Sequence, residues 1–511
     1  MLKASARFQG RNAMRLTVAE TIAVRSISQP DRTAIEVLQG GPTYTYGQIL
    51  PRIVALAEAI RGAESGPHGT MVALYLPNAA DHVLGYLACM WLGYAAVPVN
   101  SRLAEPEVDF QITDSGARTI LAAGEWLEAA KKAGARTGAK VIDADTVETP
   151  AGVDRPVLGE HDFGAKDCVV GYTSGTTGFP KGALYSNDHY LTAQMRWGWE
   201  YGLTADHVML VPGPIFHLSY AGLAMGALMI GARVRIMQHF DPALALDELT
   251  ETCTFAFLVP SMTTMIAEEW KARGKPEVHA FRFMISSGAP GPLSMTTQAM
   301  EMFANARIAE AYGWTEGGWC TFEVKQKATL LAHSVGWPTA GNEVQVFRED
   351  GTPAPVGEPG EVGVKSVTHF SGYLGRPEAT AEAWKNGYVM SGDIGIWQPD
   401  GRLCIVDRKK DMIISGGENI YTAEVERILV EHPDILEAAV VGLPDERWGE
   451  MVTAMVVPRG AAKLTAEDVI AHCRANLAHY KAPRRVEIAA ELPRNPMGKV
   501  QKFRIVESLA G

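Results

Sequence analysis

The sequence predicts a mixed α/β protein with a large N-terminal region and a small C-terminal region, and three patterns predict this class. Over most of the chain, short apolar runs alternate with helical patterns, as in parallel-rich sheets with crossover helices. From residue 341, short apolar runs flank the turns Asp350-Gly351 and Asp400-Gly401, which predicts a small antiparallel, β-barrel-like section. Beyond Arg408, helix and strand patterns over about 100 residues are enough for a small α+β domain. The predicted domains are therefore 1–408 and 409–511, with the boundary at Arg408 to Lys410.

The alternating pattern fills the N-terminal region from residue 18 to residue 311. We expect helices at 18–24, at 47–61, at 105–114 and in a segment that ends at Met90, for which Asn78 is the expected N-cap. Strands are expected at 43–46, 71–76, 95–99, 119–121, 140–142, 168–172, 208–211, 234–237, 255–259, 283–286 and 308–311. Ligands bind at the carboxyl ends of strands in open α/β sheets, so the loops 212–221, 286–290 and 312–316 are candidate ligand-binding loops.

Shorter elements are expected in the rest of the chain. The predicted strands are 344–347, 361–364, 396–397, 403–406, 438–441 and 455–457, and the predicted helices are 423–431 and 466–477. No internal repeat and no low-complexity segment interrupts them.

Composition excludes several classes of function. The net charge of −11 leaves no overall basic field, which argues against a nucleic-acid partner. The six cysteines are scattered without a Cys-x-x-Cys pair, which argues against a disulfide framework or a zinc site and favours a reducing compartment. The uncharged run 83–99 is shorter than the roughly 18 residues of a membrane span, so no integral membrane segment is expected. We interpret residues 1–13 as a short basic extension rather than a transit peptide, and take the cytoplasm as the default location.

The segment 172–182 is the most informative part of the sequence. It contains three glycines, four serine and threonine hydroxyls and Lys181, and we expect it to connect the buried strand 168–172 to a helix capped by Ser186 or Asn187. Glycines let backbone N–H groups surround an anion, and hydroxyl and ammonium groups complete the shell, so the segment suits a polyphosphate. A flexible linker is the plain alternative. A Walker loop is excluded, because Pro180 precedes Lys181 and Gly182 follows it.

The ten residues from Thr173 to Gly182 resemble the phosphate loop of the adenylate-forming superfamily, which includes acyl-CoA synthetases, adenylation domains of peptide synthetases and beetle luciferases. They match Thr-Ser-Gly-Thr-Thr-Gly-x-Pro-Lys-Gly without a mismatch, and further motifs follow in the family's order over nearly the whole chain. The resemblance implies ATP, Mg²⁺ and coenzyme A as cosubstrates or cofactors. It places these loop residues on ATP: Thr173, Ser174, Gly175, Thr176, Thr177, Gly178 and Lys181.

Two further motifs are implied to surround the nucleotide. Residues 311–316 match Tyr-Gly-x-Thr-Glu, which implies that Tyr312 stacks on adenine and that Ala311, Gly313 and Thr315 contact the nucleotide. Glu316 and Thr173 are the implied Mg²⁺ ligands, because a carboxylate that faces a triphosphate is costly unless a cation lies between them. Residues 287–290 resemble Gly-Gly-Ala-Pro with Ser287 in the first position, and would pack Gly288, Ala289 and Pro290 against the adenine and acyl groups; a plain βα turn is the alternative.

The C-terminal motifs imply the ribose, hinge and catalytic residues. Ser391-Gly392-Asp393 resembles Thr-Gly-Asp, so Asp393 and Arg408 would bind the ribose, although 407–411 by itself reads as a solvated run of charges. Lys410 is the implied hinge, and Ser415, Gly416 and Gly417 the implied contacts to the pantetheine arm of CoA. Thr422 replaces a proline that is common in relatives. Lys499 lies in the family's C-terminal lysine loop and is the implied main catalytic residue, with Lys181 and Glu316. A lysine at that place is otherwise a solvated surface residue.

The acyl pocket is the least defined part of the prediction. The resemblance places His217 at its junction with the pantetheine tunnel, although a histidine beside Phe216 is commonly a core residue. Ser219, Tyr220, Gly288, Gly313 and Trp314, with Trp197 and Leu218, are the expected lining. Gly313 replaces the tryptophan that blocks the pocket of acetate-specific relatives, so a larger acyl group is expected. A medium- to long-chain fatty acid is the predicted substrate, with an aromatic or alicyclic acid as the alternative.

The resemblance implies an acid–thiol ligase that works in two steps. The acid and ATP form an acyl-adenylate and pyrophosphate; the small domain then turns at Lys410, and CoA displaces AMP. The alternatives are an adenylating enzyme that loads a carrier protein, a luciferase-like oxidase and a non-catalytic nucleotide-binding module. The sequence does not define the oligomeric state, although homodimers are common in the family.

Overall fold

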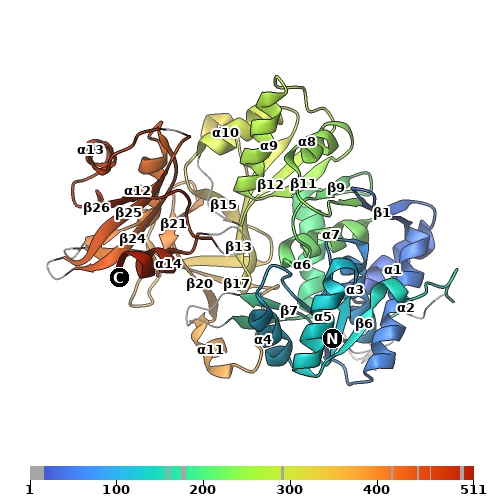
Figure 1. Ribbon diagram of the computed structural model, residues 1–511. Coiled ribbons are helices and arrows are strands. Elements are labelled where there is room, and N and C mark those ends of the chain that lie inside the picture. Colours follow the sequence, from blue (N-terminus) through green and yellow to red (C-terminus); the bar gives the residue numbers. More distant parts are fainter. Residues whose placement is uncertain are drawn as a thin grey trace, which may run out of the picture. The chain divides into compact units, whose positions relative to one another are not determined.

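The computed structural model describes residues 16–154, 156, 158–159, 163–173, 180–288, 293–415, 418–445, 448–460, 462–494 and 500–510 (Figure 1). The chain divides into two compact units. The first unit comprises Met1–Phe257, Val278–Arg282 and Val367–Thr380, and the second comprises Leu258–Glu277, Phe283–Ser366 and Ala381–Gly511. The mixed α/β class predicted from the sequence is confirmed.

One sheet of the first unit contains the strand before the glycine-rich segment. Its strand order is β18-β8-β7-β4-β3-β5-β6. The strands β3 to β7 are mutually parallel, whereas at one edge β8 is antiparallel to β7 and β18 is antiparallel to β8. The strands are β3 (Met71–Tyr75), β4 (Ala95–Pro98), β5 (Thr119–Ala122), β6 (Lys140–Asp143), β7 (Asp167–Thr173), β8 (Lys181–Ser186) and β18 (Gly372–Tyr373). The helices α3 (Ala80–Leu92), α4 (Glu105–Ser115) and α5 (Leu127–Thr137) and the short 3₁₀ helices η1 (Gly124–Trp126) and η2 (Ala144–Thr146) connect the parallel strands.

A second group of strands in the first unit has the order β9-β10-β1-β2. The strands are β1 (Thr33–Val37), β2 (Thr43–Thr45), β9 (Val208–Val211) and β10 (Arg233–Ile236), and β11 (Phe255–Leu258) also pairs with β9. The helices are α1 (Val18–Ser28), α2 (Tyr46–Ala63), α6 (Asn187–Tyr201), α7 (Leu218–Ile230) and α8 (Pro242–Glu251). Helix α7 is almost entirely buried, as expected for a helix that is apolar on all sides.

Two local predictions in this unit are wrong. The segment after β7 leads into strand β8, not into a helix, because the apolar residues 182–185 pair with β7 in antiparallel register. The helix predicted after this segment is confirmed, because α6 begins at Asn187 and Ser186 caps it by accepting a hydrogen bond from His189 N; what the prediction missed is the strand before it. Asn78 does not cap α3, because its amide group donates to the carbonyl oxygens of Gly213 and Met237 and accepts from Ile215 N.

The second unit contains an open run of strands, β12-β13-β14-β15-β21-β20-β17-β16. Only β12 and β13 are parallel; the described strands that follow are antiparallel and form no closed barrel, so the barrel-like expectation is corrected to an open sheet. The strands are β12 (Phe283–Ser286), β13 (Arg307–Trp314), β14 (Gly318–Val324), β15 (Ser334–Pro338), β16 (Asn342–Phe347), β17 (Gly360–Ser366), β19 (Trp384–Lys385), β20 (Tyr388–Trp397) and β21 (Leu403–Arg408). The helices are α9 (Pro260–Ala272), α10 (Leu293–Met302) and η3 (Lys327–Thr329), and α11 (Pro377–Glu382) links the two units along the chain.

The C-terminal part of the second unit is a sheet of order β23-β22-β25-β24, with β26 beside β25. Its elements are β22 (Ile413–Ser415), β23 (Glu418–Ile420), α12 (Thr422–Val430), β24 (Ile435–Asp445), β25 (Gly449–Pro458), α13 (Ala466–Asn476), β26 (Arg485–Ile488) and α14 (Lys502–Ala510). Alternate residues of the long strands face opposite sides, so Val440 and Val456 pack with α12 and α13, while Val441 and Met455 pack with α14. Both faces of this sheet are therefore covered.

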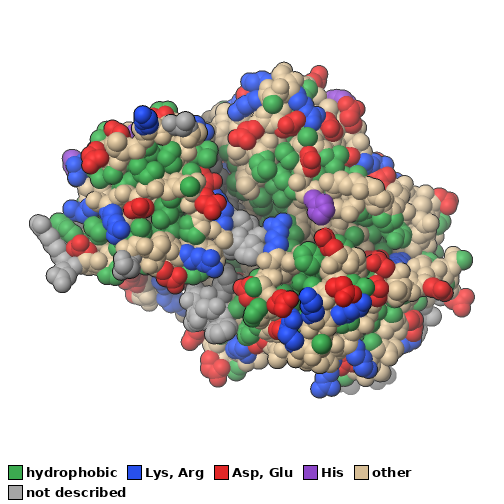
Figure 2. Space-filling view, viewed as in Figure 1, with side chains coloured by type: hydrophobic (Ala, Val, Ile, Leu, Met, Phe, Trp, Pro, Cys, Tyr) green, Lys and Arg blue, Asp and Glu red, His purple; other side chains and the backbone are tan. Residues whose placement is uncertain are grey.

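The surface and the cysteines fit the composition. Acidic and basic side chains are intermixed over the face shown in Figure 2, without a continuous basic stripe on that face. All six cysteines are buried as free thiols. None of the helices within the described ranges is both long and apolar enough to span a bilayer.

Candidate active site

The glycine-rich segment of the first unit is held at both ends by strand pairing. Thr173, the last residue of β7, lies opposite Lys181, the first residue of β8, and Thr173 Oγ1 lies 3.5 Å from the carbonyl oxygen of Lys181. Ser174, Gly175, Thr176, Thr177 and Gly178 lie outside the described residues, so their predicted phosphate contacts stay predictions. The described ends bring the Thr173 hydroxyl and the Lys181 side chain to the same end of a two-stranded ladder.

Residues that are distant in sequence support this ladder. Tyr172 donates a 2.9 Å hydrogen bond to Asp114 of α4, and Arg376 donates to the other carboxylate oxygen of Asp114 at 2.6 Å. The ring of Tyr373 lies 5.4 Å from the Lys181 ammonium. The loop is thus supported by charged and aromatic residues that sequence reasoning did not select.

The predicted acyl-pocket residues of the first unit begin helix α7. His217 is the N-cap, and its Nδ1 accepts a hydrogen bond from Ser219 N at 3.3 Å, while Leu218 is the first helical residue. Tyr220 is buried edge-on against Phe257, with ring centroids 4.9 Å apart, and burial raises the pKa of its phenol. Trp197 is buried on α6 beside Tyr201. The capping bond gives His217 a structural role beside the predicted one.

Three predicted nucleotide-binding residues of the second unit bind one another. Asp393 on β20 is 5% exposed; one of its oxygens accepts a 2.7 Å hydrogen bond from the Tyr312 hydroxyl, and the other lies 2.7 Å from Arg408 Nε. Asp393 and Arg408 are direct partners in the β20–β21 ladder. Burial, and then the nearby Asp393 carboxylate, raise the pKa of Tyr312 well above its ordinary value. The predicted ribose and adenine residues therefore form one preassembled cluster.

Glu310 is a candidate functional residue that sequence reasoning missed. It precedes Tyr312 by two positions on β13, so both side chains leave the same face of the strand, and it lies in register with Glu323 of β14. Burial raises the pKa of its carboxyl to about 7, with Lys325 opposing and Glu323 adding to the rise. An acidic residue inside an otherwise apolar strand was the available sequence signal.

The remaining motif residues of the second unit cluster at the β13–β14 turn. A Cβ added to Gly313 would lie 2.1 Å from Gly318 O, so the close approach of β14 itself requires glycine there. Trp314 lies 5.7 Å from the Tyr312 ring, and Thr315 and Glu316 form the turn that follows. Gly288 has a left-handed φ of 90°, while Ala289 and Pro290 lie outside the described residues.

The predicted Mg²⁺ ligands are a hydroxyl, Thr173, and a carboxylate, Glu316. Thr173 belongs to the first compact unit and Glu316 to the second. Within the described residues there is no group of three or more His, Cys, Asp or Glu side chains that would bind a metal by itself. Two hard oxygen donors fit Mg²⁺, which usually keeps water and phosphate oxygens in its remaining positions.

In the run of charges around the predicted hinge, residues 408–410 are exposed, but Asp407 is buried. Asp407 is 7% exposed and accepts hydrogen bonds from Thr422 N, from Thr422 Oγ1 at 3.0 Å and from Arg408 N at 2.7 Å. Lys502 donates to Thr422 Oγ1 and forms an ion pair with Glu426 at 2.8 Å. Burial raises the pKa of Asp407, and Lys502 opposes that rise. Asp407 and Thr422 lie on opposite sides of Lys410, the predicted hinge.

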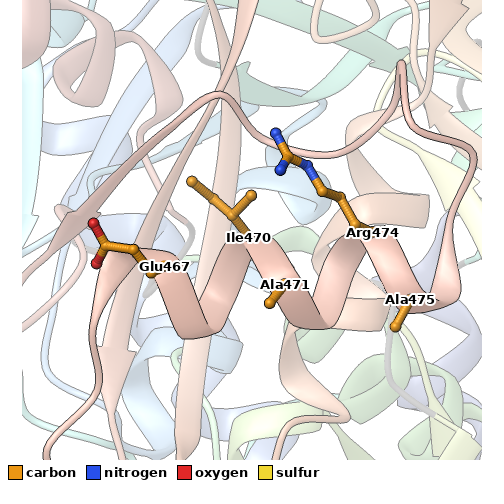
Figure 3. Close-up of a pocket in the computed structure, with 5 residues that line it drawn as sticks. All are labelled: Glu467, Ile470, Ala471, Arg474 and Ala475. Atoms are coloured by element: carbon orange, nitrogen blue, oxygen red, sulfur yellow. The ribbon is translucent and has the colours of Figure 1, made fainter.

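Other C-terminal predictions lie partly outside the described residues. Ser415 ends β22 and is buried, whereas Gly416, Gly417 and Lys499 are not described. A shallow surface groove lies along α13, lined by Glu467, Ile470, Ala471, Arg474 and Ala475 (Figure 3). The groove contains no predicted site residue, so we do not assign it to the active site.

An α/β fold with a buried carboxylate paired with arginine, and with a glycine- and hydroxyl-rich sequence between two paired strands, is the arrangement expected of a nucleotide-binding enzyme. The chain belongs to the AMP-binding enzyme family: residues 24–374 match its model, and residues 424–499 match the AMP-binding enzyme C-terminal domain. The resemblance found in the sequence is thereby confirmed.

The chain is similar to several named CoA ligases. A feruloyl-CoA synthase of an Amycolatopsis species is 36% identical over 94% of this chain and 96% of its own. A long-chain-fatty-acid–CoA ligase of Mycobacterium tuberculosis is 34% identical over 85% of this chain and 87% of its own. Among solved structures, an o-succinylbenzoate CoA synthetase from Bacillus subtilis in complex with AMP has a TM-score of 0.86 and 27% identity, and the match covers 96% of this chain and 98% of that one.

Proposed function

We propose that the chain is an AMP-forming carboxylic acid:CoA ligase. The observation that carries the proposal is the preassembled Tyr312–Asp393–Arg408 cluster in a chain of the AMP-binding enzyme family. In the first step, a carboxylate oxygen attacks the α-phosphorus of ATP and pyrophosphate leaves. In the second step, the thiol of CoA attacks the acyl carbon, its proton passes to solvent and AMP leaves.

Each described site residue has a proposed task. Lys181, with Thr173, binds the phosphates in the first unit. In the second unit, Asp393 accepts from the ribose hydroxyls, Arg408 holds Asp393 in place, and Tyr312 offers its ring face to adenine. Glu310, on the same face of β13 as Tyr312, is proposed to accept a hydrogen bond from a nucleotide N–H group. Mg²⁺ bound by Thr173 and Glu316 would neutralise phosphate charge, and Lys499 would bind the carboxylate and α-phosphate as charge gathers there.

The acid is proposed to be an apolar monocarboxylic acid. The sequence by itself favours a medium- to long-chain fatty acid. An aromatic acid is the second candidate, and it is favoured by the feruloyl-CoA synthase, which matches more of this chain at higher identity than the fatty-acid ligase. A cytoplasmic location, a homodimer, the domain boundary at Arg408 to Lys410 and the remaining pocket residues are proposed on the sequence argument given above.

The test is release of pyrophosphate and AMP with Mg·ATP over a panel of acids, each with and without CoA. The panel contains acetate, octanoate, palmitate, benzoate, ferulate and an alicyclic acid. CoA-dependent AMP release with octanoate or palmitate supports the fatty-acid assignment, and preference for ferulate supports the aromatic one. Pyrophosphate release that CoA does not accelerate would replace the ligase by a carrier-loading enzyme, and oxygen-dependent light emission would indicate luciferase-like chemistry. Purified protein analysed by size-exclusion chromatography with light scattering tests the homodimer.

A further inference from the structure

The lysine of the phosphate loop lies against an aromatic ring that no family motif used above includes. The ring of Tyr373 has its centroid 5.4 Å from Lys181 Nζ, within the range in which an ammonium is attracted to an aromatic face. Tyr373 lies 192 positions after Lys181 in the sequence and belongs to β18, a strand of two residues. The fold therefore brings this ring to the loop through strand pairing.

The register explains the contact. Tyr373 pairs with Ala183 in the antiparallel β18–β8 ladder, and Lys181 precedes Ala183 by two positions. Paired residues and residues two positions away share one face of a sheet, and long side chains reach across this diagonal. Leu374 N donates a 2.8 Å hydrogen bond to Gly182 O, which fixes the two strands beside Lys181.

Two neighbouring residues in the sequence also hold Tyr373. Tyr373 N donates a 2.9 Å hydrogen bond to Thr380 Oγ1, and the Tyr373 ring packs edge-on against the fully buried Phe370, with centroids 5.0 Å apart. A lysine side chain loses considerable rotamer freedom when it is fixed on a ligand. If an aromatic ring already restricts the ammonium before the ligand binds, less rotamer freedom is lost on binding.

We propose that Tyr373 is a positioning residue for Lys181: its ring holds the ammonium at the loop end before the triphosphate arrives. The proposal rests on the proposed function, in which Lys181 binds the phosphates. The effect is expected on ATP binding and not on recognition of the acid, because the contact involves only Lys181.

The test compares Tyr373→Leu, Tyr373→Phe and Lys181→Met by steady-state kinetics with the full chain. Tyr373→Leu removes the aromatic face, and KM for ATP is expected to rise about three- to tenfold while kcat and KM for the acid stay within about twofold. Tyr373→Phe keeps the face and is expected to stay within about twofold of the wild type. As a matched control, Tyr388→Leu removes a ring that lies 4.2 Å from Lys365 on another strand pair, and should leave KM for ATP within about twofold.

A double-mutant cycle separates positioning from simple structural support. In the Lys181→Met background, Tyr373→Leu is expected to change KM for ATP by less than about twofold, because no ammonium remains to be positioned. If Tyr373→Leu has its full effect in that background, or if Tyr373→Phe is as impaired as Tyr373→Leu, the proposal is wrong. If Lys181→Met leaves KM for ATP unchanged, the assigned role of Lys181 is wrong instead, which is a failure of the proposed function.

Discussion

In the first unit, Lys181 is supported by residues that have no predicted contact with a ligand, whereas in the second unit the predicted ligand-binding residues support one another. Tyr373 lies against Lys181, and Asp114, which binds Arg376, accepts a hydrogen bond from Tyr172 on the strand before the loop. Tyr312, Asp393 and Arg408, in contrast, form their cluster among themselves. The difference implies that substitutions in the second unit disturb several functional groups together, while those around the loop act one at a time.

The largest effect is expected for Asp393→Ala. This change removes the shared partner of Tyr312 and Arg408 and leaves a buried phenol without its acceptor, so kcat/KM for ATP should fall about 100-fold or more. Pyrophosphate release at varied ATP measures it, and circular dichroism of the variant checks that it is folded. A loss below about threefold would contradict the idea of a mutually dependent cluster.

Glu310→Gln tests the partly buried carboxyl by its pH dependence. Burial raises the pKa of Glu310 to about 7, so the folded state favours the protonated form. The stability gained in this way is complete below about pH 4.5 and is lost as the pH rises through 7. The melting temperature of the wild type should therefore fall relative to Glu310→Gln between pH 5 and pH 8. If the melting temperatures of the two proteins change in parallel with pH, the pKa of Glu310 is not raised in the folded state.

Thr422→Val tests the hydrogen bonds of Asp407 with little change in side-chain volume. It removes one donor to Asp407 and the acceptor of Lys502, but keeps the backbone N–H of residue 422. Unfolding should become easier by about 1 kcal/mol, measured by urea denaturation. Thr422→Pro also removes the N–H group and should cost more; equal stability of the three proteins would mean that these bonds contribute nothing.

The smallest effect is expected for Asp114→Asn in the first unit. Arg376 is about half exposed, and ion pairs of exposed groups contribute little, while the amide oxygen can still accept from Tyr172. KM for ATP should rise only about twofold. A change as large as that of Asp393→Ala would remove the contrast between the two regions.

The sequence was sufficient for those features that depend on local pattern. Strands such as β3 and β9, the cap at Ser186 and the family motifs were all readable, because each follows from residues that are close in the chain. The helix expected after the phosphate loop was correct, but strand β8 between the loop and that helix was missed, because its pairing with β7 is not visible in four apolar residues. Asn78 was assigned as a cap because its contacts to Gly213 and Met237 come from distant loops.

The candidate site shows the same limit. Motifs selected Tyr312, Asp393 and Arg408, yet their mutual hydrogen bonds depend on strand register, which the sequence does not display. Tyr373 was missed because its position beside Lys181 arises from the pairing of Tyr373 with Ala183 across 190 positions. Glu310 was missed because its burial is a property of the folded sheet.

The hydrogen bonds of Asp407 have a consequence for the timing of catalysis. If the chain turns at Lys410, as the family resemblance implies, the hydrogen bonds between Asp407 and Thr422 span the turning point, and we expect the turn to break them. The Asp407 carboxylate then exchanges its Thr422 donors for water when the chain turns, and exchanges water for these donors when the chain turns back. The changeover between the two half-reactions would thus be coupled to the hydration of a single side chain, and its rate would respond to solvent composition even where the chemistry does not.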